Sequence, residues 1–145
     1  MHGAGFLAFA GVESPRIPAL AIEIHLAEKL HGYSKHFPNG RGSTRVKDLI
    51  DIILIGQSFP LDASACVAAL RQTFESRDTQ KLPDHFALPP KDWSLTYRAL
   101  ARSVGIDPEI SIGHAYAAKL LDPLLGNELT ETAIWDHNAG TWREA

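Results

Sequence analysis

A chain of 145 residues with 45% apolar content is long enough to bury the core of one ordinary globular domain and too short for two domains to be expected. Its formal charge of −3, with basic and acidic residues mixed along the chain, gives no overall field that would recruit nucleic acid or an anionic membrane, so any such contact would be local. The single cysteine excludes an internal disulfide framework, and the lack of a long apolar run or a basic leader predicts neither a membrane span nor a signal peptide and favours the cytoplasm.

The first predicted element is a short β hairpin or strand pair at the N-terminus. Residues 5–11 are apolar and bounded by glycines, and residues 16–20 follow a Ser-Pro turn signal. A hairpin of this size is marginal on its own, so we expect it at the edge of a larger structure.

About five helices are predicted after the hairpin, each from apolar residues at helical spacing. The first begins at Ile22 and ends between Gly32 and Ser34. A polar loop over residues 36–43 separates it from the second, for which Ser43 or Thr44 is the predicted cap and Gly56 the predicted end.

The third helix is predicted to start at an Asp62 cap, and an irregular, proline-rich connection over residues 77–90 follows it. Asp92 is the predicted cap of the fourth helix, which ends at Gly105 in a left-handed conformation. The fifth covers residues 110–121, before an Asp-Pro pair. The tail carries two tryptophans, Trp135 and Trp142, and is expected to pack back on the body. Residues 1–145 are therefore predicted to form a single, mainly α domain.

Three charged residues on the first two helices attract attention because they flank apolar stripes. Lys29 falls at the rim of the first stripe, where its ammonium can reach solvent. Asp48 and Asp51 are three positions apart on one face of the second helix, opposite the stripe, and both are expected to point away from the core.

Two interpretations fit this pattern. In one, these charges form a solvated helix face whose pairs are each worth ~0.2–0.5 kcal/mol. In the other, Lys29 holds the phosphates of a nucleotide while an aspartate positions a metal or a reacting hydroxyl, because phosphoryl and nucleotidyl transfer depend on positioning and charge neutralisation. Periodicity does not choose between them.

Other candidate motifs are rejected on geometry. Gly42-Ser43 followed by Asp48 and Asp51 is not a strand-borne pair of metal-binding carboxylates, because i,i+3 spacing belongs to a helix. Residues 40–44 lack the Lys-Ser/Thr ending of a P-loop. The seven histidines show no coherent ligand spacing, so no metal site is predicted.

Several short motifs, in order, resemble the C-terminal half of the abortive-infection nucleotidyltransferase toxins of the AbiEii/AbiGii type. They are AEKLH at 27–31, STRVKDLID at 43–51, TFESR at 73–77 with Leu82-Pro83, and LDPLL at 121–125 before Trp135. The resemblance implies a toxin of a type IV toxin–antitoxin system acting in bacterial phage defence. It also implies nucleoside triphosphates and Mg²⁺ as cofactors, an RNA acceptor such as tRNA, and an antitoxin partner.

Carried over residue by residue, Lys29 matches the lysine of the family's third motif and would steady the triphosphate. Asp48 and Asp51 match the Arg/Lys-Asp-x-x-Asp of the fourth motif, and which of the two is catalytic stays open. Arg45 and Glu23 are predicted to help bind the nucleotide, although the helix dipole explains a carboxylate at Glu23 equally well.

The family's first motif, a Gly-Ser followed by a strand with two acidic residues, and its second motif, upstream of Lys29, have no counterpart in this sequence. We therefore expect the C-terminal part of a nucleotidyltransferase toxin, lacking the N-terminal catalytic domain, inactive alone and binding no cofactor tightly. The alternatives are a non-catalytic helical module that engages an antitoxin, RNA or a separate catalytic chain, and a structural domain on which these residues are plain surface charges.

Overall fold

The computed structural model describes residues 21–34, 45–77 and 81–144. Its helices are α2 (Ala21–Tyr33), α3 (Val46–Ser58), α4 (Ala63–Arg77), α5 (Ser94–Val104) and α6 (Ile110–Leu125), with a 3₁₀ turn, η2, at Lys91–Trp93. Three short strands, β1 (Leu61–Asp62), β2 (Ala133–Asp136) and β3 (Thr141–Glu144), form an antiparallel sheet in the order β1-β2-β3.

The predicted fold class, a mainly α bundle, is confirmed. Most of the described strands lie near the C-terminus, whereas the strand pair was predicted at the N-terminus, over residues 5–20, which lie outside the described residues. In the described part of the chain, no helix is long and apolar enough to cross a membrane.

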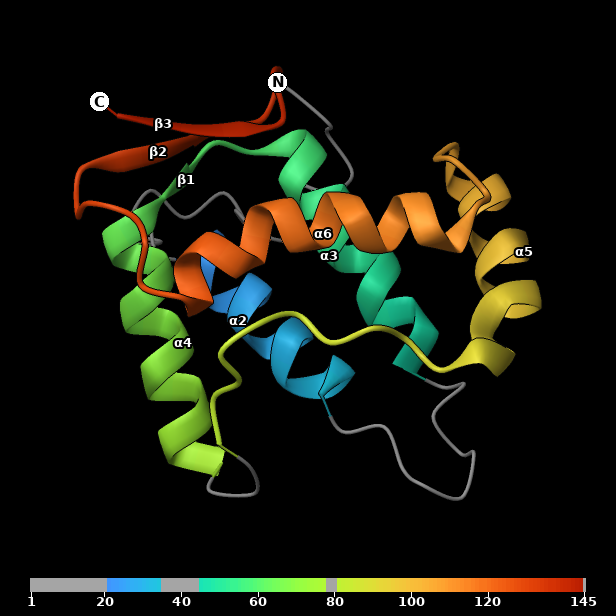
Figure 1. The fold of residues 1–145 in the computed structure, drawn as a ribbon, viewed down its shortest axis with the longest axis horizontal. Helices are drawn as coiled ribbons and strands as arrows, with labels where there is room; N and C mark the ends of the chain where they lie inside the picture. Colours follow the sequence, from blue (N-terminus) through green and yellow to red (C-terminus); the bar gives the residue numbers. More distant parts are fainter. Residues whose placement is uncertain (1–20, 35–44, 78–80, 145) are drawn as a thin grey trace.

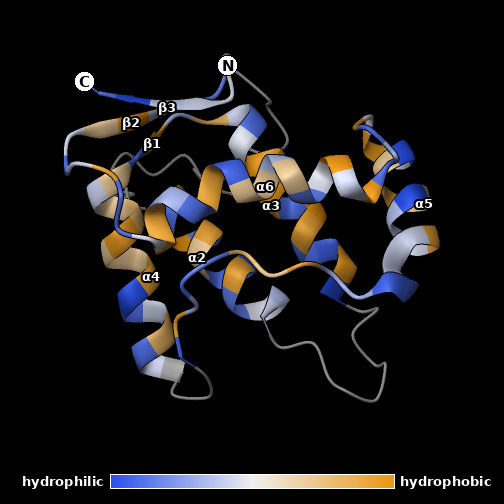
Figure 2. Ribbon diagram, viewed as in Figure 1, coloured by the Kyte–Doolittle hydropathy of each residue, from blue (hydrophilic) through white to orange (hydrophobic). Residues whose placement is uncertain are grey.

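Helix α3 is the centre of the bundle. It packs against α2, α5 and α6, and α2 packs in turn against α4. Figure 1 shows α6 crossing in front of α3, with α4 and α5 at opposite sides of the molecule and the sheet near the start of α4. Hydrophobic residues mark the surfaces where α2, α3 and α6 meet (Figure 2). Since neighbours cover α3 on several sides, more than one stripe of this helix is buried.

Local capping signals explain several helix ends. The Asp62 carboxylate accepts a hydrogen bond from the Ala65 N–H at 2.8 Å, which confirms the predicted cap of α4. Gly105 has φ +80° and ends α5 as predicted. Asp92 is not the cap of α5, because it lies inside η2 and the helix begins after Trp93. Arg45 precedes α3 without a capping side-chain bond, and the predicted caps of α3 lie outside the described residues.

The end of α6 differs from the sequence prediction. The helix continues through Asp122 and Pro123 to Leu125 instead of stopping at Leu121. A proline inside a helix removes one hydrogen bond and crowds the preceding turn. The apolar stripe nevertheless continues past the proline to the buried Leu124, and this packing explains why the helix does not stop there.

The C-terminal tail packs on the body, as the two tryptophans predict. Trp135 is fully buried in β2, and its indole N–H donates to the Gly56 carbonyl of α3 at 2.7 Å. The Trp142 indole N–H donates to the Leu120 carbonyl of α6 at 2.9 Å. The two rings meet edge to face with centroids 5.6 Å apart, so the sheet is held to the end of α3 and the middle of α6.

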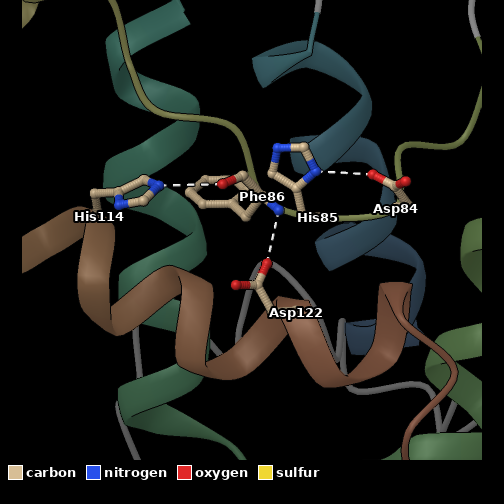
Figure 3. A network of polar contacts seen from close by, with 5 residues as sticks. All are labelled: Asp84, His85, Phe86, His114 and Asp122. Carbon is tan, nitrogen blue, oxygen red and sulfur yellow. Dashed lines mark hydrogen bonds and ion pairs between the residues drawn. The ribbon is translucent and has the colours of Figure 1, made fainter.

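The segment between α4 and η2 has no regular structure over residues 81–90, as predicted, but it is held in place (Figure 3). The Phe86 N–H donates to Asp122 at 2.7 Å, and the Phe86 carbonyl lies 3.2 Å from the His114 Nε2. The Phe86 ring stacks against those of Tyr33 and His114. The segment is therefore fixed to α2 and α6, and the hydrogen bond and ring contact explain the role of His114 as a structural residue.

Candidate functional site

The candidate site lies where α2 and α3 come close together at Gly32, in the last turn of α2. A Cβ atom added to Gly32 would lie 2.5 Å from the Asp48 Oδ2 and 3.3 Å from the Arg45 Nη1. Only a residue without a side chain leaves room for the Asp48 carboxylate where it lies. The close approach brings charged side chains of both helices into one cluster.

Two ion pairs define this cluster, which we call the charged cluster and which comprises Lys29, Arg45, Asp48 and Asp51. The Lys29 Nζ lies 2.9 Å from the Asp51 Oδ2, with 35% and 23% of the two side chains exposed. The Arg45 Nη1 lies 3.5 Å from the Asp48 Oδ2. The predicted position of Lys29 at the rim of the buried stripe is confirmed. The cluster contains two cations and two carboxylates, so its formal charges balance.

Asp48 corrects the prediction that both aspartates point away from the core. Its residue is buried, with only 9% of its surface exposed, and Asp51 is partly buried. The physical reason is that α2 packs on α3 at the Gly32 contact, so the face opposite the apolar stripe is also covered. A single stripe in the sequence cannot reveal a second neighbouring helix.

Burial raises the pKa of the Asp48 carboxyl above its ordinary value, and the charge of Asp51 raises it further. The cations Lys29 and Arg45 act in the opposite direction without cancelling the effect of burial. Within the described residues, the Asp48 Oδ2 has no hydrogen-bond partner, and its ion pair with Arg45 is long. Asp48 is therefore an incompletely satisfied buried carboxylate between two cations.

Glu23 is not among the residues that the structure brings together at Gly32. It lies six residues before Lys29 on α2, which corresponds to about 9 Å along the helix axis. It is buried, and its Oε2 accepts a hydrogen bond from the Asp62 N–H at 3.3 Å. Burial raises the pKa of the Glu23 carboxyl and also that of the neighbouring Cys66 thiol. The structure thus places Glu23 against the β1–α4 junction.

The cluster fits phosphate groups better than it fits a metal ion. Among the described residues, no group of three or more His, Cys, Asp or Glu side chains could hold a metal. Its two carboxylates already face cations, and Arg45 and Lys29 are more than a third exposed. The sequence alone does not reveal Gly32 as part of this site, because a glycine near a helix end signals only termination.

A second surface feature lies elsewhere and contains no residue of the charged cluster. A cavity of about 390 Å³ opens between the start of α4, the end of α6 and the segment that follows α6. Its wall includes Val67, Arg71, Leu124 and Glu131. No sequence motif pointed to it.

Comparison with known proteins adds one finding. A family model described as "Nucleotidyl transferase AbiEii toxin, Type IV TA system" matches residues 6–123, a range that contains the whole charged cluster. No curated protein and no solved structure matches the chain.

Proposed function

We propose, starting from the fact that this chain belongs to the AbiEii family of nucleotidyl transferase toxins of type IV toxin–antitoxin systems, that the charged cluster holds the phosphates of a nucleoside triphosphate. The family implies an antitoxin as a partner. An RNA acceptor such as tRNA, a role in phage defence by abortive infection and a cytoplasmic location are further parts of this proposal.

The observation that supports the proposal most is the position of the Lys29 ammonium. Asp51 holds it at 2.9 Å, which restricts the motion of a long side chain, while 35% of the lysine side chain stays exposed. An ammonium has three N–H donors. The ion pair with Asp51 leaves some of them available to donate hydrogen bonds to phosphate oxygens. Nucleotidyl transfer depends on such preorganised positive charge, because negative charge develops on the transferred group.

The other members of the cluster would act around Lys29. Arg45 supplies a second cation, and its planar guanidinium suits phosphate oxygens. Asp51 orients the lysine, and one of the two aspartates assists the acceptor hydroxyl. The carboxylates also keep the site neutral in the absence of nucleotide, so phosphate binding would have to displace part of the Arg45–Asp48 pair, which is the longer of the two.

Mg²⁺ is the proposed metal, and when bound it would neutralise charge on the transferred phosphate. The charged cluster does not supply a carboxylate set for it, and the sequence contains no Gly-Ser motif followed by a strand with two acidic residues. We therefore propose that the metal-binding carboxylates belong to a separate segment or chain, and that these 145 residues contribute the phosphate side of the site.

A nucleotide titration tests this proposal. The parent chain, Lys29→Ala and Lys119→Ala are titrated with ATP, GTP, CTP and UTP in the presence of Mg²⁺, with calorimetry as the readout. Lys119 is an exposed lysine on α6, outside the charged cluster, and makes a matched control for loss of one charge. We expect Lys29→Ala to weaken binding at least about tenfold, or ~1.4 kcal/mol, and Lys119→Ala to leave it nearly unchanged. Equal affinities for all three chains, or no binding by the parent, would contradict the phosphate role and favour a non-catalytic binding module.

A further inference from the structure

We propose that Gly32 is a positioning residue of this site: the space left by its missing side chain sets where the Asp48 carboxylate and the Arg45 guanidinium lie beside Lys29. The inference rests on the proposed function, because it assigns a role to a residue of the same cluster that neither the sequence motifs nor the family match identifies.

The geometry at Gly32 is tight. A Cβ atom there would lie 2.5 Å from the Asp48 Oδ2, a distance that non-bonded atoms do not tolerate, and 3.1 Å from its Cγ, a contact that requires the carboxylate to shift. The facing group is a short side chain attached to a buried part of α3, so it has little room to withdraw. The carboxylate therefore occupies the place where any other residue would put its side chain.

The space at Gly32 and the ammonium of Lys29 belong to the same side of α2, since residues three apart on a helix are neighbours. Asp48 and Asp51 of α3, and Arg45 just before this helix, face this side. A carboxylate seated at Gly32 is thus kept between the two cations of the cluster. Displacing it would change the charge that both cations present to a phosphate, without any change to Lys29 itself.

A double-mutant experiment tests the contact. Gly32→Ala is made in the parent chain and in Asp48→Ala, and stability is followed by urea denaturation. We expect Gly32→Ala to lower the denaturation midpoint of the parent but not that of the Asp48→Ala chain, where the crowded group is gone and alanine favours the helix. An equal loss in both backgrounds would overturn the inference.

Gly56→Ala is the matched control. Gly56 is a helical glycine of α3 that is crowded by Tyr116 and Leu120, at 3.0 and 3.2 Å from an added Cβ, and not by the charged cluster. We expect it to lower the midpoint by the same amount whether or not Asp48 is present.

A spectroscopic readout separates positioning from a general loss of packing. The ¹³C carboxyl resonance of Asp48 is titrated by NMR in the parent, in Gly32→Ala and in Gly56→Ala. Burial raises the pKa of this carboxyl in the parent, and Gly32→Ala should move it back toward its ordinary value by exposing the group. An unchanged titration in Gly32→Ala would contradict the inference.

Nucleotide affinity distinguishes this inference from the proposed function. We expect Gly32→Ala to weaken nucleotide binding severalfold and Gly56→Ala to leave it unchanged. If Lys29→Ala weakens binding but Gly32→Ala does not, the positioning role is wrong and the proposed function stands. If neither changes the affinity, the proposed function itself is contradicted.

Discussion

Lys29 and Asp51 form an ion pair that is short but partly open to solvent, with 35% and 23% of their side chains exposed. Exposed pairs of this kind are worth about 0.2–1 kcal/mol, because water screens the attraction and ordering two side chains costs entropy. We predict that Lys29→Ala lowers the free energy of unfolding by less than about 1 kcal/mol, measured by urea denaturation. A severe loss of stability would show that Lys29 supports the fold and would undermine its use as a probe of nucleotide binding.

Glu23 gives a prediction for pH dependence. Burial raises the pKa of its carboxyl in the folded chain above the ordinary value of 4.5. At a pH between the unfolded-state and folded-state pKa, the folded chain therefore binds more protons than the unfolded chain. The contribution of Glu23 to stability is therefore greatest at acidic pH and is lost as pH rises through the folded-state pKa. Glu23→Gln should raise stability at neutral pH relative to the parent and have little effect near pH 4.5 or below.

The measurement is the urea midpoint of both chains from acidic to neutral pH. Glu75→Gln, at an exposed carboxylate of α4, serves as the control and should follow the parent at every pH. A Glu23→Gln chain whose difference from the parent does not vary with pH would show that Glu23 is not the titrating group.

Residue-level prediction from the sequence succeeded where one helix decides the outcome. The rim position of Lys29 and the Asp62 cap both follow from local spacing. The burial of Asp48 could not be predicted, because it depends on α2 lying against a face of α3 that carries no apolar stripe. For the same reason Gly32 was visible in the sequence only as a helix end.

At the scale of elements, the sheet is joined to the bundle by its tryptophans. The Trp135 indole N–H is buried and donates to the Gly56 carbonyl at 2.7 Å. Trp135→Phe would leave that carbonyl without its donor, which costs about 1–3 kcal/mol, and lost packing adds to this. We predict a clear fall in the thermal midpoint, followed by circular dichroism. Trp142→Phe, whose bond is only partly buried, should cost less. A Trp135→Phe chain as stable as the parent would contradict this account.

Helix positions were predictable at this scale because each of the five helices in the described residues carries apolar residues at helical spacing. Their ends were predictable only where a local signal acts alone, as at Gly105. Pro123 favours an end of α6, but the apolar stripe of this helix stays buried through Leu124. The packing of that stripe outweighs the effect of the proline, and the helix continues. The strands β2 and β3 were missed, because each has only four residues and takes its partners from the fold.

At the scale of the whole molecule, the order of short motifs identified the family, which the match over residues 6–123 confirms. The apolar stripes in the sequence could not predict how α2, α3 and α4 pack together. An apolar stripe indicates that one face of a helix is buried, but not which helix covers it. The charged cluster is a product of that arrangement. The sequence predicted the residues of the charged cluster as site candidates. It could not show that Glu23 lies away from them, at the β1–α4 junction.

The lack of a carboxylate set for Mg²⁺ in the charged cluster leads to a prediction for activity. Because the cluster contains no carboxylate set for Mg²⁺, we predict that the 145-residue chain incubated with labelled nucleoside triphosphates, Mg²⁺ and bulk RNA transfers no label. Label on RNA after gel separation measures the outcome. Robust transfer that is lost in Lys29→Ala would show that the chain holds a complete site. The proposal that the metal-binding carboxylates belong to a separate segment or chain would then be wrong.

The most direct test of the central claim is to ask which lysine lies at the nucleotide phosphates. An ATP analogue with an acyl group on its terminal phosphate acylates a lysine amine held beside that phosphate and releases ATP. Peptide mapping by mass spectrometry then reads the modified residue. We predict acylation of Lys29, suppressed by excess ATP, with the exposed Lys119 modified only at the background rate. Modification of Lys91 or Lys119 in place of Lys29, or labelling of Lys29 that excess ATP does not suppress, would contradict the account.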